Sequence, residues 1–239
     1  MEQTVPVEVP RRALVVGAHP DDPEFACGGT CARWADEGVE IYYVVCTRGH
    51  KGSGDQEMTT ERLVGLREAE QRAAGAVIGA VEVNFLDFTD GELTPNLEFR
   101  GAIVKEIRRI RPDVVLTHDP TMVYSAGNIN HPDHRAVGTA TLDAIYPTAR
   151  DRLQFPAHEA AGLLPHKVLE IYLWGSAAPN VWIDISSTFD RKIEALRHHV
   201  TQVGQADKLA ERLRERSKIV GEPRGIPLAE AFFRINMAR

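Results

Sequence analysis

The sequence predicts an α/β fold, a Rossmann-like three-layer sandwich with a mostly parallel sheet and helices on both faces. Apolar runs of strand length alternate with stretches of helical periodicity through most of the 239 residues. This alternation is typical of a parallel sheet covered by helices on both sides. The hydrophobic fraction of 43% is that of a chain with a real core. We therefore expect one large α/β unit.

The strands are expected from their apolar runs. The run Ala13-Leu14-Val15-Val16-Gly17 is apolar throughout, which favours a parallel strand buried on both faces. Similar runs complete a set of six expected strands: 13–17, 40–47, 82–87, 113–117, 168–174 and 181–185.

The expected helices lie between and after these strands. Glycine or proline ends several of them, as at Gly38, before Pro112 and before Pro147. The expected helices span 27–38, 59–79, 97–111, 131–146, 187–202 and 205–218. The segment 148–166 contains two prolines and a glycine and is expected to be a surface excursion.

Composition restricts the classes of partner and location. The formal net charge is −6 and no basic block stands out, so nucleic acid and anionic membranes are not expected as partners. Residues 1–12 lack the apolar core of a secretory signal and no later stretch is long enough to span a bilayer, which predicts a cytoplasmic protein.

Because no repeat, linker or composition shift interrupts the chain, we expect a single domain over residues 1–239. Three cysteines are too few for a disulfide framework and are expected to be buried thiols.

An acid–histidine cluster, Ala18-His19-Pro20-Asp21-Asp22-Pro23-Glu24, directly follows the first expected strand. Open α/β sheets bind ligands at the carboxyl ends of their strands. His19 and Asp22 are three residues apart in a turn, close enough to chelate one metal ion. The adjacent Asp21 points in another direction and is free to act as general base on a metal-activated water.

A second cluster, His131-Pro132-Asp133-His134, follows the strand expected at 113–117. Pro132 suits the first turn of a helix, which makes His131 the N-cap and places His134 one turn later on the same face. One of these histidines completes the metal site, and the other stands beside the substrate carbonyl as an electrostatic or acid group. Asp133 either orients a histidine or interacts favourably with the helix dipole. Turn-forming Asp and Pro alone would explain one such cluster, but two clusters after two strands favour a metal site.

The two clusters resemble the signatures of the LmbE-like zinc deacetylases, the PIG-L superfamily that includes N-acetylglucosaminyl-phosphatidylinositol deacetylase. The first cluster matches the family's AHPDDxE pattern and the second its HPDH pattern. Further similar segments occur in the same order along the chain: Thr47-Arg48-Gly49, Leu66-Arg67-Glu68-Ala69-Glu70, Asp90-Gly91-Glu92-Leu93, and Ala195-Leu196 with His199, Thr201 and Gln202.

The resemblance implies a role for each matching residue. The implied ligands of one zinc ion per chain are His19, Asp22 and His134. The implied catalytic residues are Asp21 as general base, His131 as the group that stabilises or protonates the reacting centre, and Asp133 as its orienting neighbour. The implied substrate contacts are Arg67, Asp90 and Arg48.

Some relatives have a carbonyl-polarising tyrosine where this chain has Ile129, and Tyr124 is a nearby candidate for that role. The resemblance also favours a homo-oligomer.

The sequence therefore predicts a zinc-dependent hydrolase that removes an N-acetyl, or other N-acyl, group from an amino sugar or its glycoconjugate. An amidase acting on a thiol-sugar S-conjugate or another N-acyl substrate is the alternative. Two other classes are a non-haem iron enzyme, disfavoured by the βα alternation, and a non-catalytic metal-binding module, disfavoured by Asp21. Substrate specificity is expected in the segments 48–60, 119–130 and 148–166. The first of these segments either closes over the substrate or is a plain connector.

Overall fold

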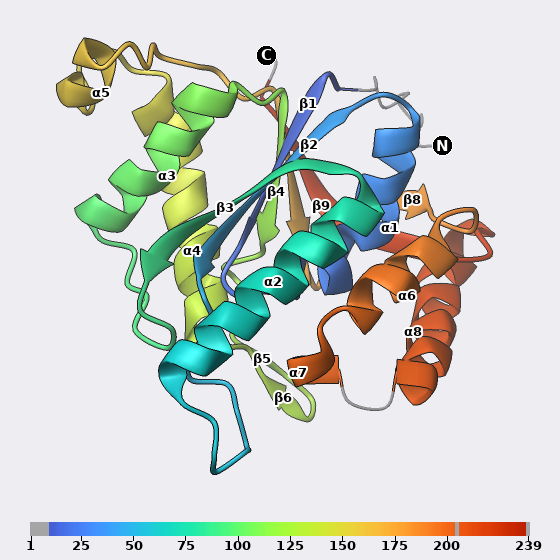
Figure 1. Cartoon of the computed structure of the whole chain (residues 1–239). Coiled ribbons are helices and arrows are strands. Elements are labelled where there is room, and N and C mark those ends of the chain that lie inside the picture. Colours follow the sequence, from blue (N-terminus) through green and yellow to red (C-terminus); the bar gives the residue numbers. More distant parts are fainter. Residues whose placement is uncertain (1–9, 204–205, 238–239) are drawn as a thin grey trace.

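A computed structural model describes residues 10–203 and 206–237. Its centre is a seven-stranded sheet with the order β3-β2-β1-β4-β7-β9-β8 (Figure 1). The first five of these strands are parallel to their neighbours, and β9 is antiparallel to both β7 and β8. The strands of the sheet are β1 (Arg12–Gly17), β2 (Glu40–Thr47), β3 (Ala80–Phe88), β4 (Val114–His118), β7 (Glu170–Trp174), β8 (Val181–Asp184) and β9 (Ala229–Asn236).

Helices cover both faces of the sheet (Figure 1). Helices α1 (Asp22–Asp36), α2 (Thr60–Ile78), α6 (Phe189–Arg197) and α8 (Ala206–Gly221) lie on one face. Helices α3 (Leu97–Ile110) and α4 (Pro132–Asp143) lie on the other. The predicted three-layer α/β class with a mostly parallel sheet is confirmed. No helix within these described ranges is long and apolar enough to cross a bilayer.

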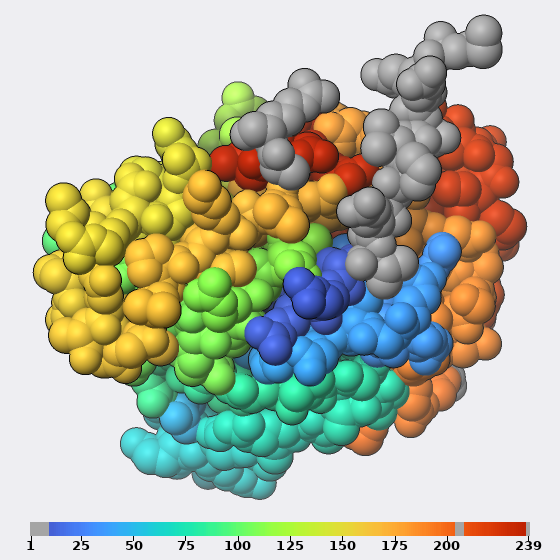
Figure 2. Space-filling model, turned by 90° about the horizontal axis from the view of Figure 1, so that it is seen from above, coloured from blue at the N-terminus to red at the C-terminus, as the bar shows by residue number. Residues whose placement is uncertain are grey.

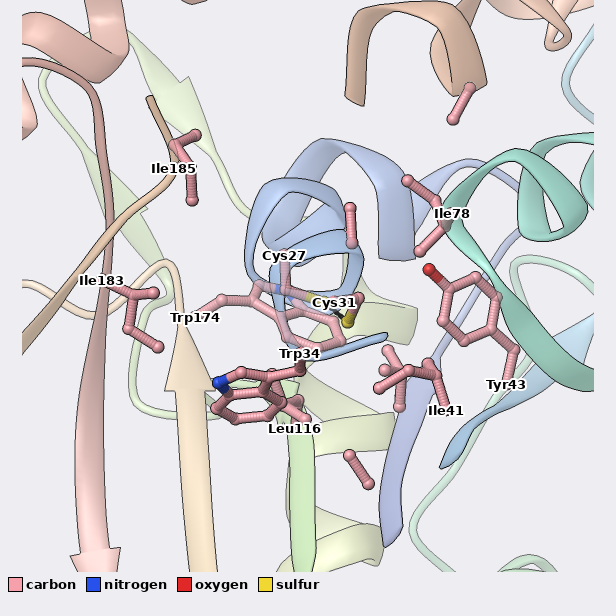
Figure 3. Packing of buried hydrophobic residues seen from close by; sticks show 14 of the residues in the cluster. Cys27, Cys31, Trp34, Ile41, Tyr43, Ile78, Leu116, Trp174, Ile183 and Ile185 are labelled. Carbon is pink, nitrogen blue, oxygen red and sulfur yellow. Dashed lines mark hydrogen bonds between the residues drawn. The ribbon is translucent and has the colours of Figure 1, made fainter. Parts of the chain in front are cut away.

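Strand β1 is apolar throughout because it contributes to two cores at once. Ala13 and Val15 belong to the core beneath α1 and α2, whereas Leu14 and Val16 belong to the core beneath α3 and α4. Successive side chains of a strand point to opposite faces, so a strand with a helix layer on each side has no polar face. Figure 3 shows the first core, in which the buried thiols of Cys27 and Cys31 lie 3.7 Å apart.

The chain order of the strands opens a crevice at the centre of the sheet. From β1 the chain passes outward through α1 to β2 and through α2 to β3, and then α3 returns it to β4 on the other side of β1. The segments that leave β1 and β4 therefore go to opposite faces. Such a reversal is the place where open α/β sheets bind ligands.

Several elements differ from those expected. Strand β9 was not expected, nor was the hairpin of β5 (Tyr124–Ser125) and β6 (Asn128–Ile129). The expected helix 187–202 is broken into α6 and α7 (Val200–Val203), and helix 131–146 continues beyond α4 as a π-type segment, η1 (Ala144–Ala149). Helix α1 begins five residues before its expected start and is kinked at Cys27. Residue 205, the expected start of the last helix, lies outside the described residues, and α8 is followed by η2 (Glu222–Arg224).

The segment 148–166, which contains α5 (Pro156–Ala160), lies at the amino-terminal end of β4, at the opposite end of the sheet from the two acid–histidine clusters. Arg108 near the end of α3 donates hydrogen bonds to five backbone carbonyl groups between Thr148 and Phe155. His166 is hydrogen-bonded to the carbonyl oxygen of Pro112, just before β4 begins. Figure 2 views this end of the sheet, with the segment in yellow at one side. None of its residues lines the cavity beside the two clusters, so the expectation that it shapes substrate specificity finds no support in this chain.

Candidate metal centre and active site

The two clusters meet at the crevice between β1 and β4. The first follows β1 and opens α1, and the second opens α4. Helix α4 approaches β4 closely at Gly138, where a Cβ atom would lie 2.5 Å from the carbonyl oxygen of His118. His134 stands one turn before Gly138 on the same helix face. Glycine at this position therefore lets His134 reach the end of β4.

Asp22 lies at the centre of the site with its two oxygens in different surroundings. Its Oδ2 accepts hydrogen bonds from the backbone N–H groups of Ala18 and His19, both at 2.8 Å, and lies 3.2 Å from Nε2 of His118. Its Oδ1 lies 3.3 Å from Nε2 of His134. Although burial opposes ionisation, His134 and His118 hold the pKa of Asp22 well below its usual value. Asp22 is therefore a carboxylate.

His134 presents one ring nitrogen to Asp22 because Asn130 holds the other. The Nδ2 of Asn130 donates to the carbonyl oxygen of Met122 at 2.7 Å, which makes Oδ1 the side facing His134. That oxygen can only accept, so Nδ1–H of His134 donates to it at 3.2 Å. The lone pair of Nε2 is then free for a cation.

His19 is oriented by two carboxylates. Its Nε2 lies 3.1 Å from Oδ1 of Asp90 and 3.2 Å from Oδ2 of Asp133, and its Nδ1 lies 3.8 Å from Oδ2 of Asp22. Although burial favours the neutral ring, the bonds with Asp133 and Asp90 raise the pKa of His19 to about 10. Because carboxylates only accept, Nε2 keeps its proton, and a cation would bind at Nδ1 by displacing the second proton of the imidazolium.

His118 and Trp174 belong to the site, although neither was predicted as a site residue. His118 is the last residue of β4 and is buried, and Nε1 of Trp174 at the end of β7 donates to its Nδ1 at 2.9 Å. Burial lowers the pKa of His118 to about 4, although Asp22 opposes this shift. The position of His118 at the end of a central strand was the available sequence signal.

Asp21 has a left-handed backbone conformation with a φ of 95°, which is uncommon outside glycine. Its backbone N–H donates to Oε1 of Gln71 at 2.8 Å, and its Oδ2 lies 3.6 Å from Nη2 of Arg67. Burial, and then the negative charge of Asp22, raise the pKa of Asp21 to about 7, while Arg67 opposes the shift. A carboxylate with a pKa near neutrality suits proton transfer.

A buried hydrogen-bond network holds the backbone of Asp21 in place. Gln71 donates from Nε2 to Glu24 at 2.9 Å, and Nε2 of His199 lies 3.1 Å from the same carboxylate. All three side chains are fully buried. Glu24 fixes which end of the Gln71 amide faces Asp21, because a carboxylate accepts and a backbone N–H donates. Glu24 therefore supports the loop rather than binding a cation.

His131 is the N-cap of α4, as predicted. Its Nδ1 accepts a hydrogen bond from the backbone N–H of Asp133 at 3.2 Å, so a neutral ring carries its proton on Nε2. Burial and nearby His19 lower the pKa of His131. Asp133 was expected to orient His131, but its carboxylate does not contact that ring. It bonds instead to His19 and to the backbone N–H groups of Gly91 and Leu93. Only the backbone of Asp133 orients His131.

Arg67 is buried, and both terminal nitrogens of its guanidinium bond to the protein, whereas its Nε has no hydrogen-bond partner among the described residues. It donates to the carbonyl oxygens of Pro20 at 2.8 Å and Gly49 at 2.9 Å. Gly49 has a φ of +64°, and a Cβ atom there would lie 2.3 Å from Nη1 of Arg67. Arg67 thus ties the loop after β2 to the catalytic loop and places a positive charge beside Asp21.

The other two implied substrate contacts lie in different surroundings. Asp90 belongs to the site, since it bonds to His19 and accepts from the backbone N–H of Lys51 at 3.0 Å. Arg48 is engaged elsewhere, by Asp87 and by Glu68 at 2.6 Å. The structure therefore brings Asp90 and Arg67 to the centre of the site and leaves Arg48 in an ion-pair cluster beside it.

A cavity of about 810 Å³ opens from the clusters toward α8. Its inner end is polar, with Asp22, His118, His131 and His134, and its outer walls combine apolar side chains with polar ones such as Arg216 and Ser217. The hairpin of β5 and β6 contributes Tyr124 and Ile129, which are cross-strand partners. Further apolar or aromatic lining residues are Phe25, Met122, Trp174, Trp182, Leu213, Ile219 and Val220.

The donor set fits a divalent transition metal. Within the part of the chain that the structure describes, three overlapping groups of side chains have ligand atoms within 4.8 Å of one another: His19 with His131 and His134; Asp22 with His118 and His134; and His19 with Asp90 and Asp133. The three expected ligands do not share one group. His19 belongs to the first and third groups, Asp22 to the second, and His134 to the first and second. Imidazole and carboxylate donors are those of catalytic zinc sites and also of non-haem iron sites.

Comparisons with known proteins agree with this geometry. The family model "PIG-L: GlcNAc-PI de-N-acetylase" matches residues 14–145, which include both clusters. The chain belongs to the PIG-L family. Diacetylchitobiose deacetylase of Thermococcus kodakarensis is 32% identical over 192 residues, covering 80% of this chain and 70% of that protein.

Two further similarities place the chain among relatives of this family. The 1D-myo-inositol 2-acetamido-2-deoxy-alpha-D-glucopyranoside deacetylase of Rhodococcus erythropolis is 31% identical and covers 84% of each chain. The structure of N,N'-diacetylchitobiose deacetylase from Pyrococcus horikoshii, complexed with an inhibitor, superposes with a TM-score of 0.88 at 28% identity. That superposition covers 95% of this chain and 84% of the Pyrococcus chain.

Proposed function

We propose that this protein is a zinc-dependent N-deacetylase that removes the acetyl group from an N-acetylated amino sugar or its glycoconjugate. The observation that carries the proposal is the convergence of Asp21, His131 and a set of metal-ligand side chains at the crevice between β1 and β4. The relatives named as deacetylases act on N-acetylated sugars, which supports the same substrate class here.

Each residue of the site can perform a separate part of the reaction. A divalent ion held by His19, Asp22 and His134 would polarise the amide carbonyl and lower the pKa of a water. Asp21 accepts the proton of the attacking water, and the same carboxyl group then supplies a proton to the leaving amine nitrogen. His131 donates from Nε2 to the carbonyl oxygen as negative charge develops on it. The neutral ring of His131 can do this because its Nδ1 is already an acceptor.

The cavity supports a substrate larger than one sugar ring. Its volume of about 810 Å³ lies within the usual range for ligand pockets, and its walls continue well beyond the metal cluster. Aromatic side chains such as Tyr124 and Trp182 offer flat apolar surfaces for sugar rings or an attached group. A conjugate is therefore a better fit than a free monosaccharide.

The test is a mass-spectrometric screen of the zinc-loaded protein against N-acetylated substrates. The panel contains N-acetylglucosamine, diacetylchitobiose, an N-acetylglucosaminyl inositol and a thiol-sugar S-conjugate. We expect loss of one acetyl group and release of acetate from at least one N-acetyl sugar. Cleavage of the S-conjugate alone would favour the amidase alternative, and no cleavage of any member would overturn the proposal.

The donor set also allows a non-haem iron enzyme, so metal analysis after aerobic purification accompanies the screen. Oxygen uptake with iron bound would favour that alternative. Homo-oligomerisation and a cytoplasmic location stay predictions. Light scattering of the purified protein and cell fractionation would check them.

A further inference from the structure

We propose that His118 is a positioning residue for Asp22, not a metal ligand, and that Trp174 holds it in the tautomer that this role requires. The inference deepens the proposed function, because it concerns the metal group on which that function rests. His118 and Trp174 are paired residues at the carboxyl ends of the parallel strands β4 and β7.

The tautomer of His118 follows from its partner. The indole N–H of Trp174 is a donor only, and it lies 2.9 Å from Nδ1 of His118. Nδ1 must therefore hold a lone pair, and a neutral ring then carries its proton on Nε2. Trp174 is buried in the core beneath α1, so this donor has a fixed direction (Figure 3).

The proton on Nε2 is directed at Asp22. Nε2 of His118 lies 3.2 Å from Oδ2 of Asp22, the oxygen that already accepts from the backbone N–H groups of Ala18 and His19. Three donors therefore occupy Oδ2. The other oxygen, Oδ1, faces Nε2 of His134 and is left for a cation. His118 thus makes Asp22 a ligand through one oxygen.

The competing role is that of a direct ligand, since His118 shares a group of potential ligand atoms with Asp22 and His134. Ligation through Nε2 would move the ring proton to Nδ1. Two donors, Nδ1–H of His118 and Nε1–H of Trp174, would then face each other at 2.9 Å in a buried place. In this nearly buried place, two donors that face each other without an acceptor between them are unfavourable.

The experiment compares His118→Gln with His118→Leu. A glutamine amide can place an N–H near the position of Nε2 and still donate to Asp22, but it has no imidazole lone pair for zinc. We expect H118Q to keep a zinc dissociation constant within about threefold of the unaltered protein, and H118L to bind zinc about 10–100-fold more weakly. The dissociation constants are measured by competition with a chromogenic chelator. Thermal melting of each variant identifies loss of fold.

Three outcomes overturn the inference. Loss of zinc from both variants, to the extent seen in His134→Ala, would make His118 a ligand. Unchanged affinity in both would show that His118 does not position Asp22. Long-range proton–nitrogen NMR spectra of the unaltered protein give the third test: Nε2 of His118 should carry a proton both before and after zinc is added, and replacement of that proton by zinc contradicts the proposal. These readouts involve no substrate, so they are separate from failure of the deacetylase proposal.

Discussion

At the scale of single residues, the catalytic loop places two neighbouring carboxylates in opposite electrostatic surroundings. Asp22 is ionised through its histidine neighbours, whereas the pKa of Asp21 rises to about 7 through burial and the charge of Asp22. Two titratable groups with such separated pKa values are suited to different roles. Asp22 suits a ligand, and Asp21 suits a proton acceptor.

Replacing Asp21 by Asn should separate these roles. Asn tolerates the left-handed backbone of this position and retains the N–H that Gln71 accepts. We expect kcat to fall by about 10²–10⁴-fold, because general base catalysis is lost. Zinc content, measured by mass spectrometry of the metal, should be unchanged. Full activity of D21N would exclude Asp21 as the base.

The pH dependence of kcat/KM should show an acidic limb. Asp21 must be unprotonated to accept a proton, so activity rises with pH through its pKa, which a bound cation brings below about 7. Arg67 lowers this pKa, so Arg67→Met should move the limb to higher pH, whereas Arg67→Lys should move it less. A rise in KM with an unmoved limb would instead make Arg67 a substrate contact.

At the scale of elements, the site depends on how closely α4 approaches the end of β4. Gly138→Ala would place a Cβ atom 2.5 Å from the carbonyl oxygen of His118, and backbone cannot give way as a flexible side chain does. We expect α4 to shift, with a loss of about 1–3 kcal/mol in the free energy of unfolding and weaker zinc binding through His134.

The matched control is Gly65→Ala, in the exposed interior of α2. A Cβ atom there meets nothing within 4 Å. Alanine should stabilise the protein by about 0.5–1 kcal/mol through helix propensity and leave zinc binding unchanged. Chemical denaturation with chelator competition measures both. A zinc affinity in G138A equal to that in G65A would contradict the structural role of Gly138.

At the scale of the whole molecule, hydrogen bonds to one buried carboxylate connect strand β9 to helix α1. Glu230 on β9 accepts hydrogen bonds from the backbone N–H groups of Gly29 and Thr30 and pairs with Lys192 of α6 at 2.6 Å. Both N–H groups directly follow the kink of α1 at Cys27. Glu230 therefore joins three elements that are distant in sequence.

Glu230→Ala should cost about 3–5 kcal/mol in the free energy of unfolding, because it leaves Lys192 buried without its partner. The control is Asp190→Ala, which breaks the exposed pair with Arg214 and should cost less than about 1 kcal/mol. Urea denaturation of both variants measures the difference. Equal, small losses would show that the buried pair contributes no more than a surface one.

Metal removal should also act on the whole fold. The site gathers the carboxylates of Asp22, Asp90 and Asp133, and a ligand that binds only the folded state stabilises it. At a free zinc concentration 100-fold above the dissociation constant, the gain is about 2.7 kcal/mol. Chelation should therefore lower the melting temperature of the unaltered protein but leave that of His134→Ala unchanged. An equal effect on both would place the stabilising zinc elsewhere.

The elements whose signals are local could be predicted from the sequence alone. The fully apolar run of β1 predicted a strand buried on both faces, and the spacing within 18–24 and 131–134 predicted where cation ligands and a base would lie, because strand ends and helix caps are set by neighbouring residues. Which strands are adjacent became known from the three-dimensional fold. The fold places β9 between β7 and β8, brings Trp174 to His118, and places 148–166 at the end of the sheet away from the site. These results depend on contacts between residues far apart in the chain, for which local periodicity carries no information. For the same reason the loop after β1 indicated a metal site and a proton acceptor, whereas the orientation of each ligand atom was settled by residues that the fold brings from β4, α4 and β7.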